Sequence, residues 1–314
     1  MRILRSLNNC SFNEPILTIG TYDGVHLGHQ SIIREMVARA RAAGKESVLM
    51  TFEPHPRMVL QPLDHQVELI DTLDEKLAKL DGLGLDTVIL YPFSIDFARL
   101  SATDFIEQIL VKALGVSEVH VGYDHQFGKN REGTYELLVQ KGKEFGYSVT
   151  QIEARSIQGV AISSTKIRQA IRKGDVETAE HYLGRSHALS GTVIHGNKLG
   201  RTIGFPTANI DWKDSTKLLP ENGVYAVRVE VKNTWFEGVM NIGVKPTVQK
   251  LPKLTAEVFI FDFDQDIYNE LIKVEFVKHL RGEQKFDSVE SLKNQLKKDE
   301  ELARSVFSSR VVRD

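Results

Sequence analysis

Residues 16–29 read ILTIGTYDGVHLGH, an apolar strand that runs into a glycine-containing turn just before a helical pattern. Gly20, Gly24 and Gly28 let the backbone approach a ligand closely. Free N–H groups and the positive end of the helix dipole favour phosphate at such a position. The stretch therefore predicts a phosphate-binding turn between a strand and a helix.

Two histidines of this stretch, His26 and His29, stand three residues apart, so both imidazoles face one side of a first helical turn. The two imidazoles can donate hydrogen bonds to one phosphate. Their position after a strand, a glycine and Asp23 favours this interpretation. Two alternatives stay open. The histidines can merely cap or pack at the helix start, and they can bind zinc, although the motif lacks an obvious third ligand.

The first half of the chain alternates short apolar runs with helical patterns. The expected strands are residues 16–19, 48–50, 88–90, 119–121 and 149–152. Apolar residues recur at helical spacing over 32–40 and 105–113, the second stretch being preceded by Ser101 as an N-cap. This alternation predicts an α/β domain with a doubly wound parallel sheet and helices on both faces. Ligands should lie beyond the carboxyl ends of its strands.

From about Leu189 the pattern changes to a period of two. Apolar and polar residues alternate over 225–231 and 272–276, which is typical of half-buried antiparallel strands. A small antiparallel β-barrel is the economical prediction. Apolar residues at helical spacing between Val289 and Val306 predict a terminal helix that covers one side of this barrel.

Length and composition fit a globular chain of two domains. With 314 residues, we expect domains at 1–184 and 185–314. Forty Lys and Arg residues against 42 Asp and Glu give a formal charge of −2, which argues against broad nucleic-acid binding. Cys10 is the only cysteine, so a reducing compartment, the cytoplasm, is expected. Neither a signal peptide nor a membrane span is predicted.

A second motif lies at residues 191–209, which read GTVIHGNKLGRTIGFPTAN. It is not a Walker loop, because no Gly-Lys-Ser/Thr has the required spacing and no helical pattern follows. Glycines that permit a tight backbone alternate with basic side chains: Gly196, Lys198, Gly200, Arg201 and Gly204. Thr207 and Asn209 offer two hard oxygen ligands on one side of a strand. This pattern suits MgATP bound by a barrel loop.

The N-terminal motifs resemble a known family. Residues 20–29 look like the His-x-Gly-His signature of the nucleotidylyltransferase superfamily. The segments TFEPHP at 51–56, GYDHQFG at 122–128 and ISSTKIR at 162–168 resemble the adenylyltransferase module of bacterial bifunctional riboflavin kinase/FAD synthetases. The resemblance implies transfer of AMP from ATP to FMN, which gives FAD and pyrophosphate, with Mg2+ sharing the phosphate charge.

The same resemblance implies residue roles. His26 and His29 contact the triphosphate and stabilise charge as the FMN phosphate attacks. Residues 163–165 and Arg168 hold the leaving pyrophosphate. The full set of nucleotide and flavin contacts is Gly20, Asp23, Gly28, His55, Asp124, Phe127, Ser163, Ser164, Thr165 and Arg168. Without the resemblance, the serines read as helix caps, Arg168 as a solvated helix residue, and Asp124 and Phe127 as loop anchors.

The C-terminal half resembles riboflavin kinases. GFPTAN at 204–209 matches their signature closely, and residues 222–226, 238–247, 256–263 and 280–286 continue the likeness. The resemblance implies ATP-dependent phosphorylation of riboflavin to FMN, with Thr207 and Asn209 as Mg2+ ligands and Glu257 as the general base. Gly196, Lys198 and Arg201 bind the nucleotide, and Arg281 closes a loop over the flavin. Taken alone, Glu257 and Arg281 read as surface charges.

Five residues depart from the family pattern: Tyr22, His125, Val248, Gln265 and Asn269. Tyr22 replaces a common Phe conservatively. His125 also stands where Phe is usual and makes a proposed aromatic wall more polar, which puts the flavin contacts in question but not the phosphate chemistry. Gln265 and Asn269 replace glycines and Val248 replaces a Phe, so a turn or a flavin contact changes while no proposed catalytic group is lost.

The hypothesis is thus a bifunctional enzyme of flavin cofactor synthesis whose partners are riboflavin, FMN and ATP, not nucleic acid or membrane. The oligomeric state stays open, with a homo-oligomer among the options. One alternative is another nucleotidylyltransferase, acting for example on a phosphopantetheine or a polyol phosphate, with an auxiliary barrel; GFPTAN argues against it. The other is a non-catalytic flavin- or RNA-binding barrel, which the balanced charge does not favour.

Overall fold

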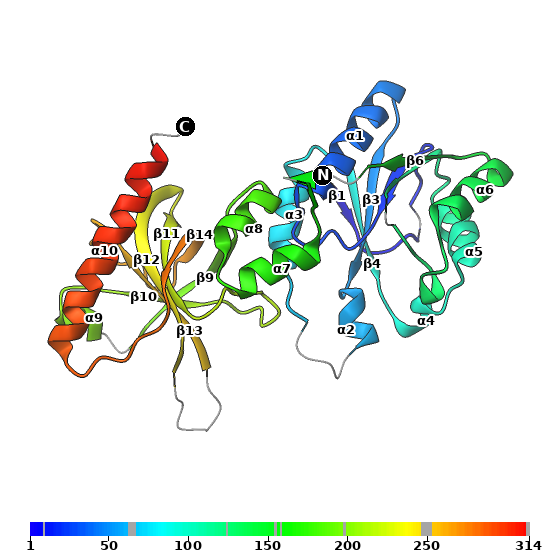
Figure 1. The fold of residues 1–314 in the computed structure, drawn as a ribbon. Helices are drawn as coiled ribbons and strands as arrows, with labels where there is room; N and C mark the ends of the chain where they lie inside the picture. The colour runs from blue at the N-terminus through cyan, green and yellow to red at the C-terminus, as the bar shows by residue number, and fades with distance from the viewer. Residues whose placement is uncertain are drawn as a thin grey trace. The chain divides into compact units, whose positions relative to one another are not determined.

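The computed structural model describes residues 1–8, 10–61, 67–123, 125–153, 156–157, 159–196, 199–245 and 253–311. The chain divides into two compact units, Met1–Ser164 and Thr165–Asp314. Each unit has its own sheet and its own core (Figure 1). The domain boundary expected after residue 184 stays a prediction.

The first unit is built on a parallel sheet with the strand order β1-β4-β3-β2-β5-β6. Its strands are β1 (Arg2–Leu4), β2 (Ile16–Ile19), β3 (Ser47–Glu53), β4 (Thr87–Pro92), β5 (Glu118–Gly122) and β6 (Ser148–Ile152). All five expected strands are present, and β1 adds an edge strand that was not predicted. A short hairpin, β7 (Ser156–Ile157) and β8 (Val160–Ala161), stands apart from this sheet.

Helices and turns connect the strands. They are α1 (Leu27–Ala43), α2 (Pro56–Leu60), α3 (Leu73–Asp81), α4 (Ile95–Ala98), α5 (Ala102–Phe105), the π-helical segment η1 (Ile106–Ala113), the 3-10 turn η2 (Lys129–Arg131) and α6 (Tyr135–Phe145). Ser101 caps α5 as predicted, since its hydroxyl accepts the Asp104 N–H at 3.0 Å. The expected helix over 105–113 exists, but it is π-helical from Ile106 onward.

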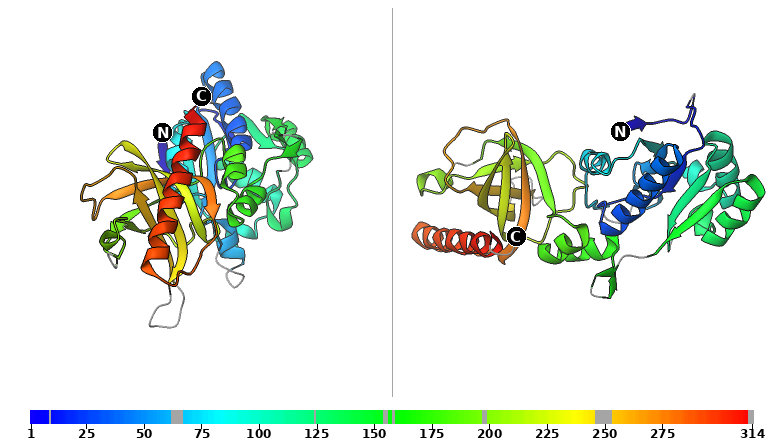
Figure 2. Two further views of the ribbon diagram at one scale, coloured as in Figure 1. Left: turned by 60° about the vertical axis from the view of Figure 1, so that its left-hand side comes forward. Right: turned by 90° about the horizontal axis from the view of Figure 1, so that it is seen from above.

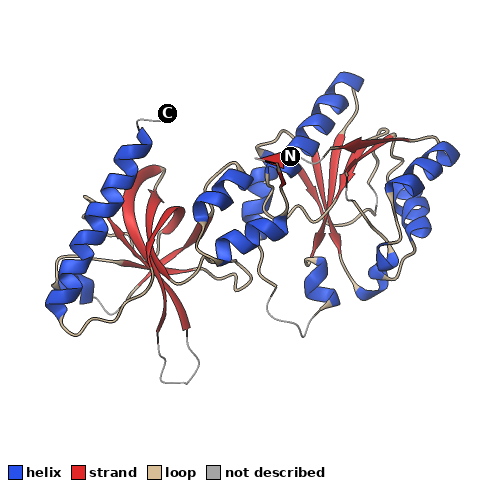
Figure 3. Cartoon of the chain, viewed as in Figure 1, coloured by secondary structure: helices blue, strands red, loops and turns tan. Residues whose placement is uncertain are grey.

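Alternating strand side chains form two cores, one on each face of the sheet. Ile16 and Leu49 pack with α1 and α3, whereas Leu17 and Val48 pack with η1 and α6. Helices therefore cover both faces (Figure 3). This confirms the predicted doubly wound sheet, and it places the β2–α1 turn at the carboxyl edge where such folds bind ligands.

The second unit holds α7 (Ser164–Arg172), which begins at the last residue of the first unit, and α8 (Val176–Leu183), followed by a closed barrel of strand order β10-β13-β12-β11-β14-β9. The remaining elements are β9 (Ala188–Ile194), α9 (Leu199–Thr202), β10 (Ala208–Asp211), β11 (Gly223–Val231), β12 (Thr234–Lys245), β13 (Lys253–Ile260), β14 (Leu271–Arg281) and α10 (Val289–Val311). Both the barrel and the terminal helix were predicted.

The period of two decides which side chains fill the barrel. Tyr225, Val227 and Val229 point into its core, together with residues of the other strands. The outward-facing Ala226 is also buried, because α10 lies along this side of the barrel and packs Ala303 and Phe307 against it. Figure 2 shows α10 beside the strands in two further views.

Candidate active sites

The turn between β2 and α1 orients its two histidines through the start of the helix. His26 is the N-cap, and its Nδ1 accepts the His29 N–H at 3.3 Å. The two imidazoles stack, with ring centroids 3.5 Å apart and planes 18° from parallel. His26 therefore caps the helix, and both rings lie on one side of its first turn, while phosphate binding by the two histidines stays a prediction.

The backbone of this turn takes positive φ at three residues and is strained at the two that are not glycine. Tyr22, Gly24 and Val25 have φ of 50°, 83° and 35°, and a β-branched residue such as Val25 rarely adopts a positive φ. Asp23 stabilises the turn, because its carboxylate accepts the Ile70 N–H at 3.0 Å. Strain of this kind persists where surrounding contacts enforce it, often at binding sites.

The pKa of the His29 imidazole is shifted downward. Burial lowers its pKa well below the usual value, and the neighbouring His26 lowers it further, whereas Asp71 raises it and Lys76 lowers it. Its Nδ1 has no hydrogen-bond partner among the described residues. His29 also lines the cavity beside the N-terminus of α1, where an imidazole is suited to meet a phosphate oxygen.

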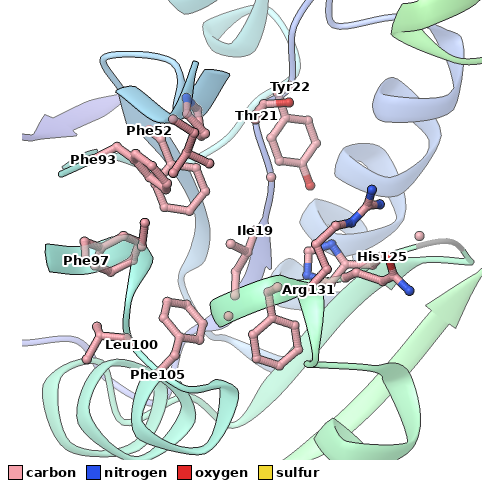
Figure 4. Close-up of a pocket in the computed structure, with 18 of the residues that line it drawn as sticks. Ile19, Thr21, Tyr22, Phe52, Phe93, Phe97, Leu100, Phe105, His125 and Arg131 are labelled. Atoms are coloured by element: carbon pink, nitrogen blue, oxygen red, sulfur yellow. The ribbon is translucent and has the colours of Figure 1, made fainter. Parts of the chain in front are cut away.

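A cavity of about 640 Å³ adjoins His29. One side is aromatic, with Phe52, Phe93, Phe97 and Phe105 in a chain of ring contacts 5.5 to 6.0 Å apart. His125 and Arg131 lie on the opposite side (Figure 4). The cavity thus combines a surface for a flat aromatic ligand with polar groups beside the phosphate-binding turn.

Other predicted residues of the first unit surround this turn. A Cβ at Gly28 would lie 3.2 Å from the His26 ring, so glycine lets the ring lie against the backbone. Gly20 lines the cavity. Phe127 extends its aromatic side, with its ring centroid 5.5 Å from that of Phe105. Ser164 donates its hydroxyl hydrogen to the Asp23 carbonyl at 3.0 Å.

The remaining predicted site residues of the N-terminal half lie on several different elements. His55 caps α2 by accepting the Arg57 N–H at 3.2 Å. Ser163 directly precedes α7, while Thr165 and the buried Arg168 lie on α7 and belong to the second unit. Asp124 lies outside the described residues.

In the barrel, three predicted residues meet on neighbouring strands. Asn209 of β10 lies opposite Glu257 of β13 in the strand register. Thr207, just before β10, donates its hydroxyl hydrogen to Glu257 Oε2 at 3.4 Å. Glu257 also lies opposite Asn241 of β12, a residue without a predicted role. A Cβ at Gly196 would overlap the Asn209 side chain, so a larger residue there would displace the Asn209 amide.

Two cavities meet at Thr207. One, of about 400 Å³, is lined by Arg201, Phe263 and Tyr268. The other, of about 380 Å³, is lined by Glu257, Arg281, Phe259, Phe286 and Leu292. Thr207 is thus the residue common to the lining of both cavities. Val248 and Lys198 lie outside the described residues.

Arg281 forms an ion pair with the terminal helix, and its expected closure over the flavin stays a prediction. Its Nε and Nη2 donate to the Asp299 carboxylate of α10 at 2.8 and 2.7 Å, and Asp299 is 2% exposed. Its guanidinium also lies 5.9 Å from the Phe286 ring centroid. The pair joins β14 to α10 at the wall of the second cavity.

The described residues contain no group of three or more His, Cys, Asp or Glu side chains placed to hold a metal ion. Among the described residues, no third side chain of these types is therefore placed to bind zinc together with His26 and His29. The same residues include no helix long and apolar enough to cross a bilayer.

In a comparison with known proteins, each half of the chain matches a family model. A FAD synthetase family model matches residues 9–166, and a riboflavin kinase model matches residues 183–307. A bifunctional riboflavin kinase/FMN adenylyltransferase of Haemophilus influenzae is 40% identical over 312 residues, with 98% of this chain and all of that protein covered. The chain belongs to the bifunctional riboflavin kinase/FMN adenylyltransferase family. It is an enzyme with both activities of that family.

Further relatives agree with this assignment. The proteins of the same description from Escherichia coli K12 and Bacillus subtilis are each 39% identical, with 98% and 94% of this chain and 98% and 93% of the relatives covered. A crystal structure described as a macrolide-efflux protein of Streptococcus pneumoniae is 35% identical, with a TM-score of 0.88 over 96% of this chain and 98% of that one. That likeness extends the shared fold over both halves.

Proposed function

We propose that the cavity beside the β2–α1 turn carries out adenylyl transfer. FMN places its isoalloxazine ring against the aromatic side formed by Phe52, Phe93, Phe97 and Phe105. The triphosphate of ATP lies at the N-terminus of α1, where N–H groups and the helix dipole favour negative charge. An FMN phosphate oxygen then attacks the α-phosphorus, and pyrophosphate leaves.

The proposed roles of the side chains combine the geometry of the turn with the family resemblance. His29 donates a hydrogen bond to a phosphate oxygen as charge develops there, and its stacked neighbour His26 fixes its orientation. Residues 163–165 and Arg168 hold the pyrophosphate, as the family resemblance implies. Catalysis is positioning and electrostatic stabilisation, without a covalent enzyme intermediate.

We further propose that the barrel phosphorylates riboflavin. Glu257 accepts the proton of the riboflavin 5′-hydroxyl as this oxygen attacks the γ-phosphorus of ATP. The apolar cavity with Phe259 and Phe286 holds the flavin, and the cavity with Arg201 holds the nucleotide. Thr207 lies where the two meet.

Mg2+ fits the oxygen donors at this junction. The Thr207 hydroxyl and the Asn209 amide oxygen are hard ligands beside the Glu257 carboxylate. Two neutral ligands leave most coordination positions to phosphate oxygens and water, which is how Mg2+ is commonly bound with nucleotides. When bound, the ion neutralises charge on the transferring phosphate.

The observation that carries this proposal is the meeting of Thr207, Asn209 and Glu257 at the junction of two cavities. Chromatography of the products formed from riboflavin, ATP and Mg2+ tests it together with the N-terminal reaction. We expect FMN to appear first and FAD to follow. Failure to form FMN would refute the barrel site, and FMN without FAD would refute the N-terminal one.

The proposal also covers the compartment, the partners and the oligomeric state of the protein. Cys10 as the lone cysteine supports a cytoplasmic enzyme. The balanced charge supports small-molecule partners over nucleic acid. Size-exclusion chromatography with light scattering would establish whether the protein is a homo-oligomer.

A further inference from the structure

A buried lysine lies beneath the phosphate-binding turn. Lys76 belongs to α3 and is only 8% exposed. Its ammonium donates to Thr51 Oγ1 at 3.4 Å and to the Thr21 carbonyl at 3.5 Å. Thr51 donates to the same carbonyl at 3.1 Å. Two buried side chains therefore hold the carbonyl group at which the chain enters the turn.

No carboxylate of the described residues forms an ion pair with this ammonium, although Lys79 on the next turn of α3 pairs with Asp71 at 2.6 Å. Glu53, Asp23 and Asp71 act on Lys76 only at longer range, where they raise its pKa against the larger lowering by burial. A buried cation without a close counter-ion is costly. A ligand that brings negative charge would offset this cost.

The position of Lys76 connects it to the proposed ATP site. Thr21 lines the cavity, and the next residue, Tyr22, has the positive φ of 50° that begins the strained turn. Lys76 is also close enough to lower the pKa of the His29 imidazole. Its positive charge therefore reaches the place where phosphate would lie.

We propose that Lys76 is a positioning residue of adenylyl transfer: it fixes the Thr21 carbonyl below the turn and directs positive potential at the triphosphate of ATP. This inference rests on the ATP site proposed above. Lys76 acts through Thr21 and through its field, because it does not itself line the cavity. Neither the periodicity of α3 nor the motifs of the first unit single it out.

Lys76→Met tests the inference, since Met keeps the length and apolar stem of lysine and removes the charge. We expect the KM for ATP in FAD formation to rise about tenfold or more, while the KM for FMN changes little. Riboflavin kinase activity of the same protein should be unchanged. Replacing a buried, poorly paired cation with an apolar residue should also preserve the melting temperature. Lys112→Met, which removes the same charge from an exposed position of η1, is the matched control.

The outcomes separate this inference from the proposed function. If His29→Ala leaves FAD formation intact, the ATP site itself is misplaced. A different result refutes only the role of Lys76. In that case His29→Ala loses FAD formation, but Lys76→Met keeps the wild-type KM for ATP or raises the KM values for ATP and FMN equally. Should Lys76→Met not fold, Lys76→Gln replaces it with the same expected selective loss for ATP. Unfolding of both variants would assign Lys76 to the fold and overturn the inference.

Discussion

The two proposed ATP sites differ in architecture. In the first unit, one contiguous turn at the carboxyl edge of a parallel sheet brings together His26, His29 and the end of a helix. In the barrel, Asn209 and Glu257 come from neighbouring antiparallel strands, with Thr207 just outside. The turn provides a helix dipole and imidazole side chains, whereas the barrel provides a carboxylate that we propose as the base. This difference suits attack by a phosphate that is already ionised in one case and by a hydroxyl that must lose a proton in the other.

The largest effect should come from removing the base. Glu257→Gln keeps the shape and the Thr207 contact but cannot accept the proton, so riboflavin phosphorylation should fall by about 10²- to 10⁴-fold. Adenylylation of supplied FMN should continue at the wild-type rate. Both rates are measured on one preparation by chromatography. A kinase rate close to wild type would show that the base lies elsewhere.

Removing a donor from the turn should have the opposite selectivity. His29→Ala should lower FAD formation by roughly 10²-fold, the size typical of one lost transition-state hydrogen bond, and spare FMN formation. His181→Ala, on α8 and exposed, is the control for loss of a histidine. Equal losses of both activities would contradict the assignment of the turn to one reaction.

The wall of the barrel cavity depends on one buried ion pair. Asp299→Asn removes the charge that Arg281 contacts at 2.7 and 2.8 Å. We expect the second unit to lose about 3 kcal/mol of unfolding free energy and the KM for riboflavin to rise. Denaturant unfolding and kinase assays measure the two effects. A normal KM would show that the pair supports the fold alone.

The smallest predicted effect is a pH dependence of the first unit. The pKa of His29 is lowered by burial, so the unfolded chain binds a proton there that the folded protein excludes. This contribution to the free energy of unfolding is fully present above the unfolded pKa of about 6.5. It is lost as pH falls below that value, by at most about 1.4 kcal/mol per pH unit. His29→Ala should flatten the melting profile between about pH 6.5 and 5.5. An unchanged slope would place the cause in another group.

Periodicity made much of the fold predictable. The five apolar runs of the first unit form parallel strands, because strands buried on both faces are apolar throughout. The alternating residues around Tyr225 form a barrel strand, because a strand buried on one face alternates apolar and polar residues. The π-helix η1 was not predictable, since eight residues do not distinguish its wider turn from an α-helix. Strand β1 was too short and too exposed to leave a pattern.

Local spacing alone predicts candidate site residues only where they are contiguous, and Glu257 and residues 163–168 needed the family resemblance. The turn holding His26 and His29 and the segment from Thr207 to Asn209 could be found from local spacing. The aromatic side of the first cavity could not, because Phe52, Phe93 and Phe105 come from separate parts of the chain and meet only in the folded sheet. For the same reason, nothing local connects Arg281 with Asp299.

Mixing the two variants tests the separation of the sites most directly. Glu257→Gln and His29→Ala are combined with riboflavin and ATP carrying distinguishable isotopes at the α- and γ-phosphorus. The His29→Ala enzyme should release FMN bearing the γ label, and the Glu257→Gln enzyme should convert it to FAD bearing both labels. A mixture that forms no FAD, or FAD without the γ label, would contradict two sites that attack different phosphorus atoms of ATP.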